Sequence, residues 1–223
     1  KAFESIFWSV SCISWPLAVF RKEAIYNYIP AWENDSFLGQ PFRFATDRTL
    51  TAYVLWAEKV GKVLKGEYRD TDFSYDWKIE DKKWDVVYSK SSRSKTMVPD
   101  TFKRLVKQHV RWKKSFLRNM FLTWWIYWNR HWIPAVLYYF HIVFVLVWPF
   151  VAARHLLYLP IHGDIFSPII YLTGIFFVGA VFGIACKIED PDTKLWKYRP
   201  FMSLFSTLIL SWLIFYSLVT IKK

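Results

Sequence analysis

Hydrophobic and polar positions divide the sequence into a mixed first part and a strongly apolar second part. Residues 1–45 alternate short apolar runs with turn-forming residues, which predicts strands and loops at the edge of an α/β core. The spacing of Leu50, Val54 and Ala57 predicts a short helix. Residues 65–85 are rich in Asp, Lys, Tyr and Trp and show no sustained period, which is typical of a surface insert.

A second helix is expected from Pro99 onward, with Asp100 in its first turn. Apolar positions at helical spacing predict a buried face made of Phe102, Leu105, Val106, His109 and Phe116. A separate stripe carries Arg104, Gln108, Arg111 and Ser115, and Trp112 lies one turn past Gln108. An amide, a guanidinium and an indole therefore share one patch of this helix, formed by Gln108, Arg111 and Trp112.

Two functions fit this patch. A guanidinium binds a diphosphate through two parallel hydrogen bonds, and an indole offers a flat apolar face to a sugar ring. The patch therefore suits a sugar nucleotide. The same residues also suit a basic amphipathic helix lying on anionic lipid, and spacing alone favours this second interpretation.

The second part of the chain has the pattern of membrane helices. Residues 132–153 and 165–186 carry no formal charge, and each run is long enough to cross a hydrocarbon core of about 30 Å. Residues 113–130 mix aromatic and basic side chains, which predicts a helix in the membrane interface. Residues 200–221 are apolar enough for a third span, but their row of hydroxyl side chains favours an interfacial or re-entrant helix.

Basic residues are distributed unevenly between the loops of this apolar region. The loop 187–199 carries four Lys and Arg residues, whereas the loop 154–164 carries only Arg154. The positive-inside rule therefore places the loop 187–199 and the N-terminal part of the chain on the cytoplasmic side. A third crossing would put Lys222 and Lys223 outside, which also favours the interfacial interpretation of residues 200–221.

Composition supports a membrane protein and limits its ligands. The chain has 223 residues, of which 54% are hydrophobic and 21% aromatic, and its net charge is +12. Such an aromatic content is typical of membrane interfaces, and the positive charge suits anionic lipid or phosphorylated substrates. We recognise no nucleic-acid-binding module. Cys12 and Cys186 lie in dissimilar surroundings, and no metal-ligand spacing is present, so neither a disulfide nor a metal site is predicted.

Several short segments resemble one family of enzymes. Gln108-His109-Val110-Arg111-Trp112 fits Q-x-x-R-W, the signature of processive family-2 glycosyltransferases such as hyaluronan, chitin and cellulose synthases. Residues 11–17 resemble S-C-x-S-G-P-L of hyaluronan synthases, and residues 37–40 match their F-L-G-Q segment. Residues 44–51 resemble F-G-D-D-R-x-L-T. These segments occur in the same order as in the family, so together they indicate the family more specifically than any single segment does.

The resemblance continues downstream and covers nearly the whole chain apart from residues 65–85. Residues 111–116 are similar to R-W-S-K-S-x, and residues 201–206 resemble a later membrane segment of the family. The implied fold is α/β, a partial GT-A-type glycosyltransferase domain at 1–112, followed by an α-helical membrane region at 131–223. The family's first catalytic half and N-terminal membrane helices would then precede Lys1.

The implied function is transfer of sugar from a UDP-sugar to a growing extracellular polysaccharide, by a multi-pass plasma-membrane protein whose catalytic part is cytoplasmic. Hyaluronan synthase-like activity is the first expectation, and a chitin synthase-like or other β-glycan synthase is the second. A non-catalytic membrane anchor or interaction protein is the third. The family implies a divalent cation, Mg²⁺ or Mn²⁺, whose ligands are not in this chain, and we expect the fragment alone to be inactive.

The resemblance also assigns roles to single residues. Asp47 matches the last Asp of F-G-D-D-R and is the expected general base, although an Asp before a helix is also a favoured N-cap. Arg111 is expected at the diphosphate and Trp112 at the acceptor, with Gln108 as a further substrate contact.

Three more expected substrate contacts, Cys12, Ser14 and Trp15, come from the S-C-x-S-G-P-L segment. The sequence departs from the family pattern at two places. Trp15 replaces a Gly, and its indole is expected either to fill that space or to stack on a sugar. Trp15 leaves the identity of the polymer and processivity open. Ala45 and Thr46 replace the Gly and the first Asp of F-G-D-D-R, which leaves their effect on the acceptor pocket open.

Overall fold

The computed structural model describes most of the chain as two units, and each is considered by itself. The first unit comprises residues 1–140 and 220–223, and the second comprises residues 141–219. The residues that the structure describes are 2–13, 17–42, 46–57, 60, 84–89, 91, 96–124, 127–129 and 131–222. The expected insert at 65–85 lies almost entirely outside these residues.

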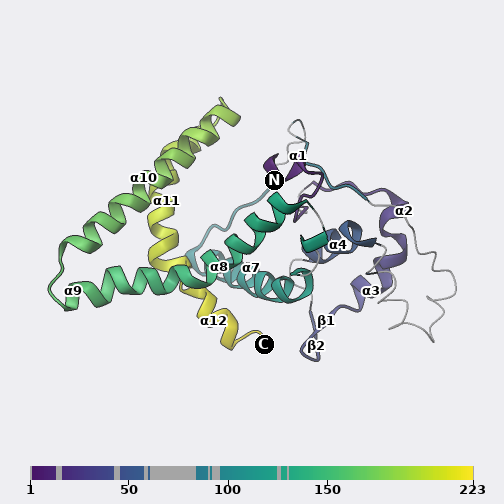
Figure 1. Ribbon diagram of the computed structural model, residues 1–223, viewed down its shortest axis with the longest axis horizontal. Helices are drawn as coiled ribbons and strands as arrows, with labels where there is room; N and C mark the ends of the chain where they lie inside the picture. Colours follow the sequence, from purple (N-terminus) through teal and green to yellow (C-terminus); the bar gives the residue numbers. More distant parts are fainter. Residues whose placement is uncertain are drawn as a thin grey trace. The chain divides into compact units, whose positions relative to one another are not determined.

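Short helices dominate the start of the first unit (Figure 1). They are α1 (Ala2–Ile6), α2 (Lys22–Ile25), η1 (Tyr26–Tyr28), α3 (Ile29–Glu33) and α4 (Thr46–Leu55). The prediction of mainly strands and loops in residues 1–45 was therefore wrong in its local detail. One physical reason lies in α3, where Pro30 occupies the first turn, a position in which proline's fixed φ favours helix formation.

A parallel backbone contact joins the N-terminal segment to a distant part of the chain. The Val10 amide donates to the Val86 carbonyl at 3.1 Å, and the Val86 amide donates to the Trp8 carbonyl at 3.1 Å. Val10 and Val86 are buried and pack in one apolar cluster with Ala52 and Val54 of α4. This cluster fixes the segment after Val10 alongside α4.

The F-L-G-Q segment forms a tight hairpin between β1 (Ser36–Phe37) and β2 (Gln40–Pro41). Leu38 and Gly39 have φ values of 54° and 78°. Positive φ at both central residues is what a type I′ hairpin turn requires. Glycine adopts this conformation freely, whereas Leu38 is held there by the turn.

The helix α7 (Phe102–Thr123) begins later than the sequence predicted. Thr101 has extended backbone angles, and its side chain accepts a hydrogen bond from the Arg104 amide at 3.4 Å. Pro99 and Asp100 therefore precede the helix, and Asp100 instead pairs with the Arg104 guanidinium at 2.8 Å. Thr101 is the N-cap, and the helix begins after it because the Thr101 hydroxyl accepts a hydrogen bond from a backbone amide of the first turn that has no partner within the helix.

The expected apolar face of α7 is not the buried one. Phe102 is exposed and its four partners on that face are only half-buried. The buried side chains lie further along the helix and are mostly polar: Lys114, Ser115, Leu117, Arg118 and Asn119. This helix packs through its C-terminal half, where polar groups find specific partners.

Within the described part of the chain, three helical stretches are long and apolar enough to cross a membrane, as judged by length and composition: residues 132–161, 166–189 and 195–219. The first comprises α8 (Trp132–Ala153), the π-helix η3 (Arg154–Tyr158) and α9 (Leu159–Ile161). The second is α10 (Phe166–Glu189), and the third comprises η4 (Leu195–Tyr198), α11 (Arg199–Phe205), the π-helix η5 (Ser206–Leu210) and α12 (Leu213–Val219).

These stretches confirm the predicted fold class, a small mixed α/β part followed by a helical membrane region. The expected loop 154–164 is mostly helical, because the π-turn continues α8 as far as Ile161. Whether residues 200–221 cross the membrane or lie in its interface stays a prediction.

Two glycines let α10 approach η4 and α11 closely, and Figure 1 shows α10 beside α11. A β-carbon at Gly179 would lie 2.7 Å from the Pro200 Cα, and one at Gly183 would lie 2.6 Å from the Trp196 carbonyl oxygen. Both distances are shorter than real contacts of a β-carbon. The spacing of these glycines, four residues apart, matches the small-xxx-small pattern of membrane helix pairs.

Candidate functional site

Asp47 occupies the first turn of α4 and meets a side chain 35 residues earlier in the chain. Its Oδ2 atom lies 3.7 Å from the Cys12 Sγ, within reach of a thiol hydrogen bond. Its Oδ1 accepts a hydrogen bond from the Arg48 amide at 3.0 Å. Asp47 is thus the second residue of α4 and not the residue before it, so the expected N-cap position was wrong by two residues.

Backbone contacts hold the Cys12 segment on α4. The Ile13 amide donates to the Thr51 Oγ1 at 3.1 Å, and the same hydroxyl donates to the Asp47 carbonyl at 2.7 Å. Thr51 is buried, so both bonds are shielded from water. The next two predicted contacts, Ser14 and Trp15, lie outside the described residues.

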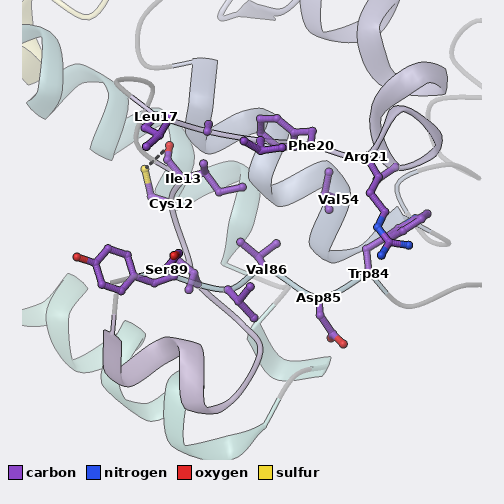
Figure 2. A pocket seen from close by; sticks show the side chains of 16 residues that line it. Cys12, Ile13, Leu17, Phe20, Arg21, Val54, Trp84, Asp85, Val86 and Ser89 are labelled. Atoms are coloured by element: carbon purple, nitrogen blue, oxygen red, sulfur yellow. Dashed lines mark hydrogen bonds between the residues drawn. The ribbon is translucent and has the colours of Figure 1, made fainter. Parts of the chain in front are cut away.

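Cys12 also lines a cavity of about 610 Å³ (Figure 2). Apolar side chains such as Phe20, Val54 and Val86 form much of its wall. Figure 2 places Arg21 and Trp84 at the end away from Cys12, so a cation and an indole stand opposite the thiol. A mainly apolar cavity with a few polar groups has the character of a small-ligand site.

The predicted patch of α7 lies at the surface. Arg111 is exposed, Gln108 is half-buried, and the Trp112 side chain is 48% exposed. The His109 ring meets the Trp112 ring edge-on, with 5.0 Å between centroids. Burial lowers the pKa of His109, and the nearby Lys113 charge adds to that effect. The Trp112 indole of the patch therefore lies beside the His109 ring, whose neutral form is favoured.

Sequence reasoning missed a buried ion pair between α7 and the segment after α3. Arg118 and Asp35 form this pair, and their side chains are only 3% and 7% exposed. The second arm of the guanidinium donates to the Thr49 Oγ1 at 2.6 Å, and Thr49 is fully buried. Arg118 lies in the stretch 113–130 that was expected in the membrane interface, and that expectation stays a prediction. The two residues of the pair are 83 positions apart, so the sequence held no periodic signal for it.

Asp35 is poorly solvated despite its partner. Burial raises the pKa of the Asp35 carboxyl, and the adjacent Arg118 charge opposes that rise. Its Oδ2 atom is buried and has no hydrogen-bond partner among the residues that the structure describes. The carboxylate therefore depends on Arg118, which supplies the opposing positive charge.

Comparison with known proteins gives one consistent result. The chain is 25% identical to hyaluronan synthase 3 of Xenopus laevis over 228 aligned positions, which cover 100% of this chain and 35% of the relative. Hyaluronan synthase 2 of Bos taurus and hyaluronan synthase 3 of Homo sapiens show the same identity and coverage. The chain is hyaluronan synthase-like. No family model matches it.

The hyaluronan synthase-like chain spans about a third of the length of these relatives. Its described residues contain no group of three His, Cys, Asp or Glu side chains that would hold a metal ion. The described residues therefore offer no complete protein ligand set for the divalent cation expected from the family.

The structure of this hyaluronan synthase-like chain brings together two of its sequence landmarks, at Cys12 and at Asp47. It places the patch of Gln108, Arg111 and Trp112 on another helix, α7, which packs on α4 through Arg118 and Thr49. The roles of all these side chains remain predictions.

Proposed function

We propose that the complete protein is a membrane-embedded glycosyltransferase that transfers sugar from a UDP-sugar to a growing extracellular polysaccharide, as a hyaluronan synthase does. The observation that carries this proposal is the contact of Cys12 with Asp47 beside the cavity. Two segments 35 residues apart, each resembling a family landmark, meet here, and Cys12 of this contact also lines the cavity. The catalytic unit lies on the cytoplasmic side of the plasma membrane, where UDP-sugars are available.

In this proposal Asp47 is the general base. An acceptor hydroxyl gives its proton to the Asp47 carboxylate while its oxygen forms a bond to the anomeric carbon of the donor. The bond between that carbon and the diphosphate oxygen breaks, and UDP leaves with the electron pair. The Oδ2 atom is suited to receive the proton because its neighbour is only a weakly bound thiol.

The patch on α7 is assigned to the substrates. Arg111 binds the diphosphate with its planar fork, Gln108 supports the donor, and Trp112 stacks on the acceptor sugar. Exposure of Arg111 and Trp112 supports this assignment, since both side chains are open to a ligand. Cys12, Ser14 and Trp15 complete the acceptor side.

A chitin synthase-like or other β-glycan synthase is the second candidate. Trp15, Ala45 and Thr46 favour it over a strict hyaluronan synthase, because they replace the small and acidic residues of that family's pattern. Turnover of UDP-glucuronic acid together with UDP-N-acetylglucosamine supports the first candidate. Turnover of a single UDP-sugar supports the second, and no turnover of any donor indicates a non-catalytic membrane protein.

The decisive experiment compares Asp47→Asn with the parent in the complete protein. We expect UDP affinity to stay unchanged and UDP release to fall by roughly 10²–10⁴-fold, because Asn keeps the size but takes no proton. Arg111→Lys should also lose most activity, whereas Arg104→Lys, an exposed arginine on the same helix, should not. Normal turnover by Asp47→Asn with intact UDP binding would remove Asp47 from the mechanism.

A further inference from the structure

Arg118 joins three separate segments of the first unit. One arm of its guanidinium donates to Thr49 in the first turn of α4, and the other pairs with Asp35 between α3 and β1. The Phe42 ring lies 5.5 Å from the guanidinium carbon, and the Phe42 amide donates to the Asp35 carbonyl at 2.9 Å. A planar fork with several fixed donors suits such divergent partners, whereas a lysine ammonium does not.

The position of Arg118 on α7 links this contact to the proposed substrate patch. Arg111 and Arg118 are seven residues apart, so they lie on one face of the helix, about 10 Å apart along its axis. Ser115 lies between them on that face and is buried, as is Arg118, whereas Arg111 is exposed. On this face of α7, the side chain at the patch is exposed to solvent, whereas the side chain two turns later is buried and contacts α4.

The other end of this contact lies close to the proposed base. Thr49 follows Asp47 by two residues in the same helical turn of α4. A shift of Arg118 relative to Thr49 would therefore move the donor-binding helix relative to Asp47. Catalysis is sensitive to such shifts, because a displacement of about 1 Å costs up to about 10²-fold in rate.

We propose that Arg118, held by Asp35 and Thr49, is a positioning residue that sets α7 and its substrate patch in register with Asp47. This rests on the proposed function. Arg118 contacts no substrate, and it acts through the two helices that it joins. Asp35 is the second part of the device, because without its charge one arm of the guanidinium would be unpaired in a buried site.

The test uses Arg118→Lys, Arg118→Met and Thr49→Val in the complete protein. The control is Arg104→Met, which removes an ion-paired arginine from the exposed part of the same helix. Hydrogen–deuterium exchange of peptides covering 46–55 and 112–121 is measured alongside kcat and KM for the UDP-sugar, with activity expressed per folded protein.

We expect faster exchange in both peptides for the Arg118 variants and a fall in kcat of roughly 10–100-fold. KM for the donor should change little, because the donor-binding residues all lie on α7. Arg104→Met should alter neither measurement. Thr49→Val keeps the ion pair of Arg118 with Asp35, so its increase in exchange and its fall in kcat should both be smaller. This variant still tests the proposal if Arg118→Met does not fold.

Two results would overturn the proposal. Unchanged exchange in Arg118→Lys would show that the guanidinium does not hold α7 on α4. A normal kcat per folded protein, with exchange increased, would make Arg118 a purely structural residue. If the parent turns over no UDP-sugar, the proposed function fails, and the exchange measurement alone still decides whether Arg118 joins the helices.

Discussion

Two pairs of helices in this chain are held together by opposite means. In the first unit, α7 meets α4 through a buried guanidinium and a buried hydroxyl, and a buried carboxylate between α3 and β1 pairs with the same guanidinium. In the second unit, Gly179 removes side-chain bulk where α10 meets α11, and Gly183 does so where α10 meets η4. The first contact depends on matched polar groups, and the second depends on the lack of side-chain atoms at the two glycines.

The difference follows from the surroundings in which each contact forms. In water, apolar burial alone brings helices together, and a buried ion pair then selects one arrangement among several. In lipid, the surrounding tails are as apolar as the side chains, so close approach of the backbones has to supply the contact energy. The second unit therefore uses small residues where the first uses charges.

Removal of the Arg118 guanidinium should lower the free energy of unfolding more than any other change to these two helix contacts. Arg118→Met leaves Asp35 buried without its counter-charge, which typically costs about 3–5 kcal/mol of unfolding free energy. Thermal unfolding of the complete protein in detergent measures this loss at pH 7. Arg104→Met is the control, and its exposed pair should contribute about 0.5 kcal/mol or less.

The same variant should show a specific pH dependence. Burial already raises the pKa of Asp35 and Arg118 opposes the rise, so Arg118→Met should raise that pKa further. A raised carboxyl pKa penalises the folded state as pH increases through it, and the penalty is absent below the unfolded value. Arg118→Met should therefore recover stability relative to the parent as the pH falls from neutral toward 4. A loss independent of pH would contradict the assignment.

A smaller effect should come from the hydroxyl that completes the polar contact. Thr49→Val keeps the shape of the side chain but leaves one arm of the Arg118 guanidinium without its acceptor. A hydrogen bond to a charged group contributes about 1.5–3 kcal/mol, and the loss should appear in the same unfolding measurement. Thr49→Ser restores an acceptor and should recover most of the loss, which a simple packing defect would not allow.

The smallest of the three effects should come from the glycine contact. Gly183→Ala places a β-carbon 2.6 Å from the Trp196 carbonyl oxygen, which is backbone and yields only by moving the helices apart. Overpacking of this kind costs about 1–3 kcal/mol. Gly174→Ala is the matched control on α10, because its β-carbon meets nothing within 4 Å. Equal stability of the two variants would show that the contact between α10 and η4 does not depend on close approach.

The sequence predicted the membrane region better than the first unit. The expected span 132–153 has the same bounds as α8, but the helical stretch continues through η3 and α9 to Ile161. The expected span 165–186 misses the last turn of α10, which continues to Glu189. The predicted span stopped before Lys187 because that residue is charged, but a charged residue does not by itself end a helix.

The candidate site could be predicted only in part. The landmarks at Cys12 and Asp47 were identified from the resemblance, but nothing in the sequence shows that their side chains meet. The pair of Asp35 and Arg118 could not be found, because contacts between residues 83 positions apart leave no periodic signal. Arg118 also follows a run of basic residues, and such a run is usually a solvated face.

The π-turn η5 changes how the last apolar stretch responds to alteration. The Ser211 amide donates to the Ser206 carbonyl at 2.8 Å, five residues back, so this turn holds one residue more than an α-helical turn. Each residue of an α-helix rotates the next by about 100°. A π-turn takes up its additional residue locally, so deleting one residue from 206–210 would turn it into an α-helical turn and keep the side-chain directions of α12. Deleting a residue within α12 would instead rotate every side chain that follows. This stretch therefore tolerates a change of length at η5 that α12 does not.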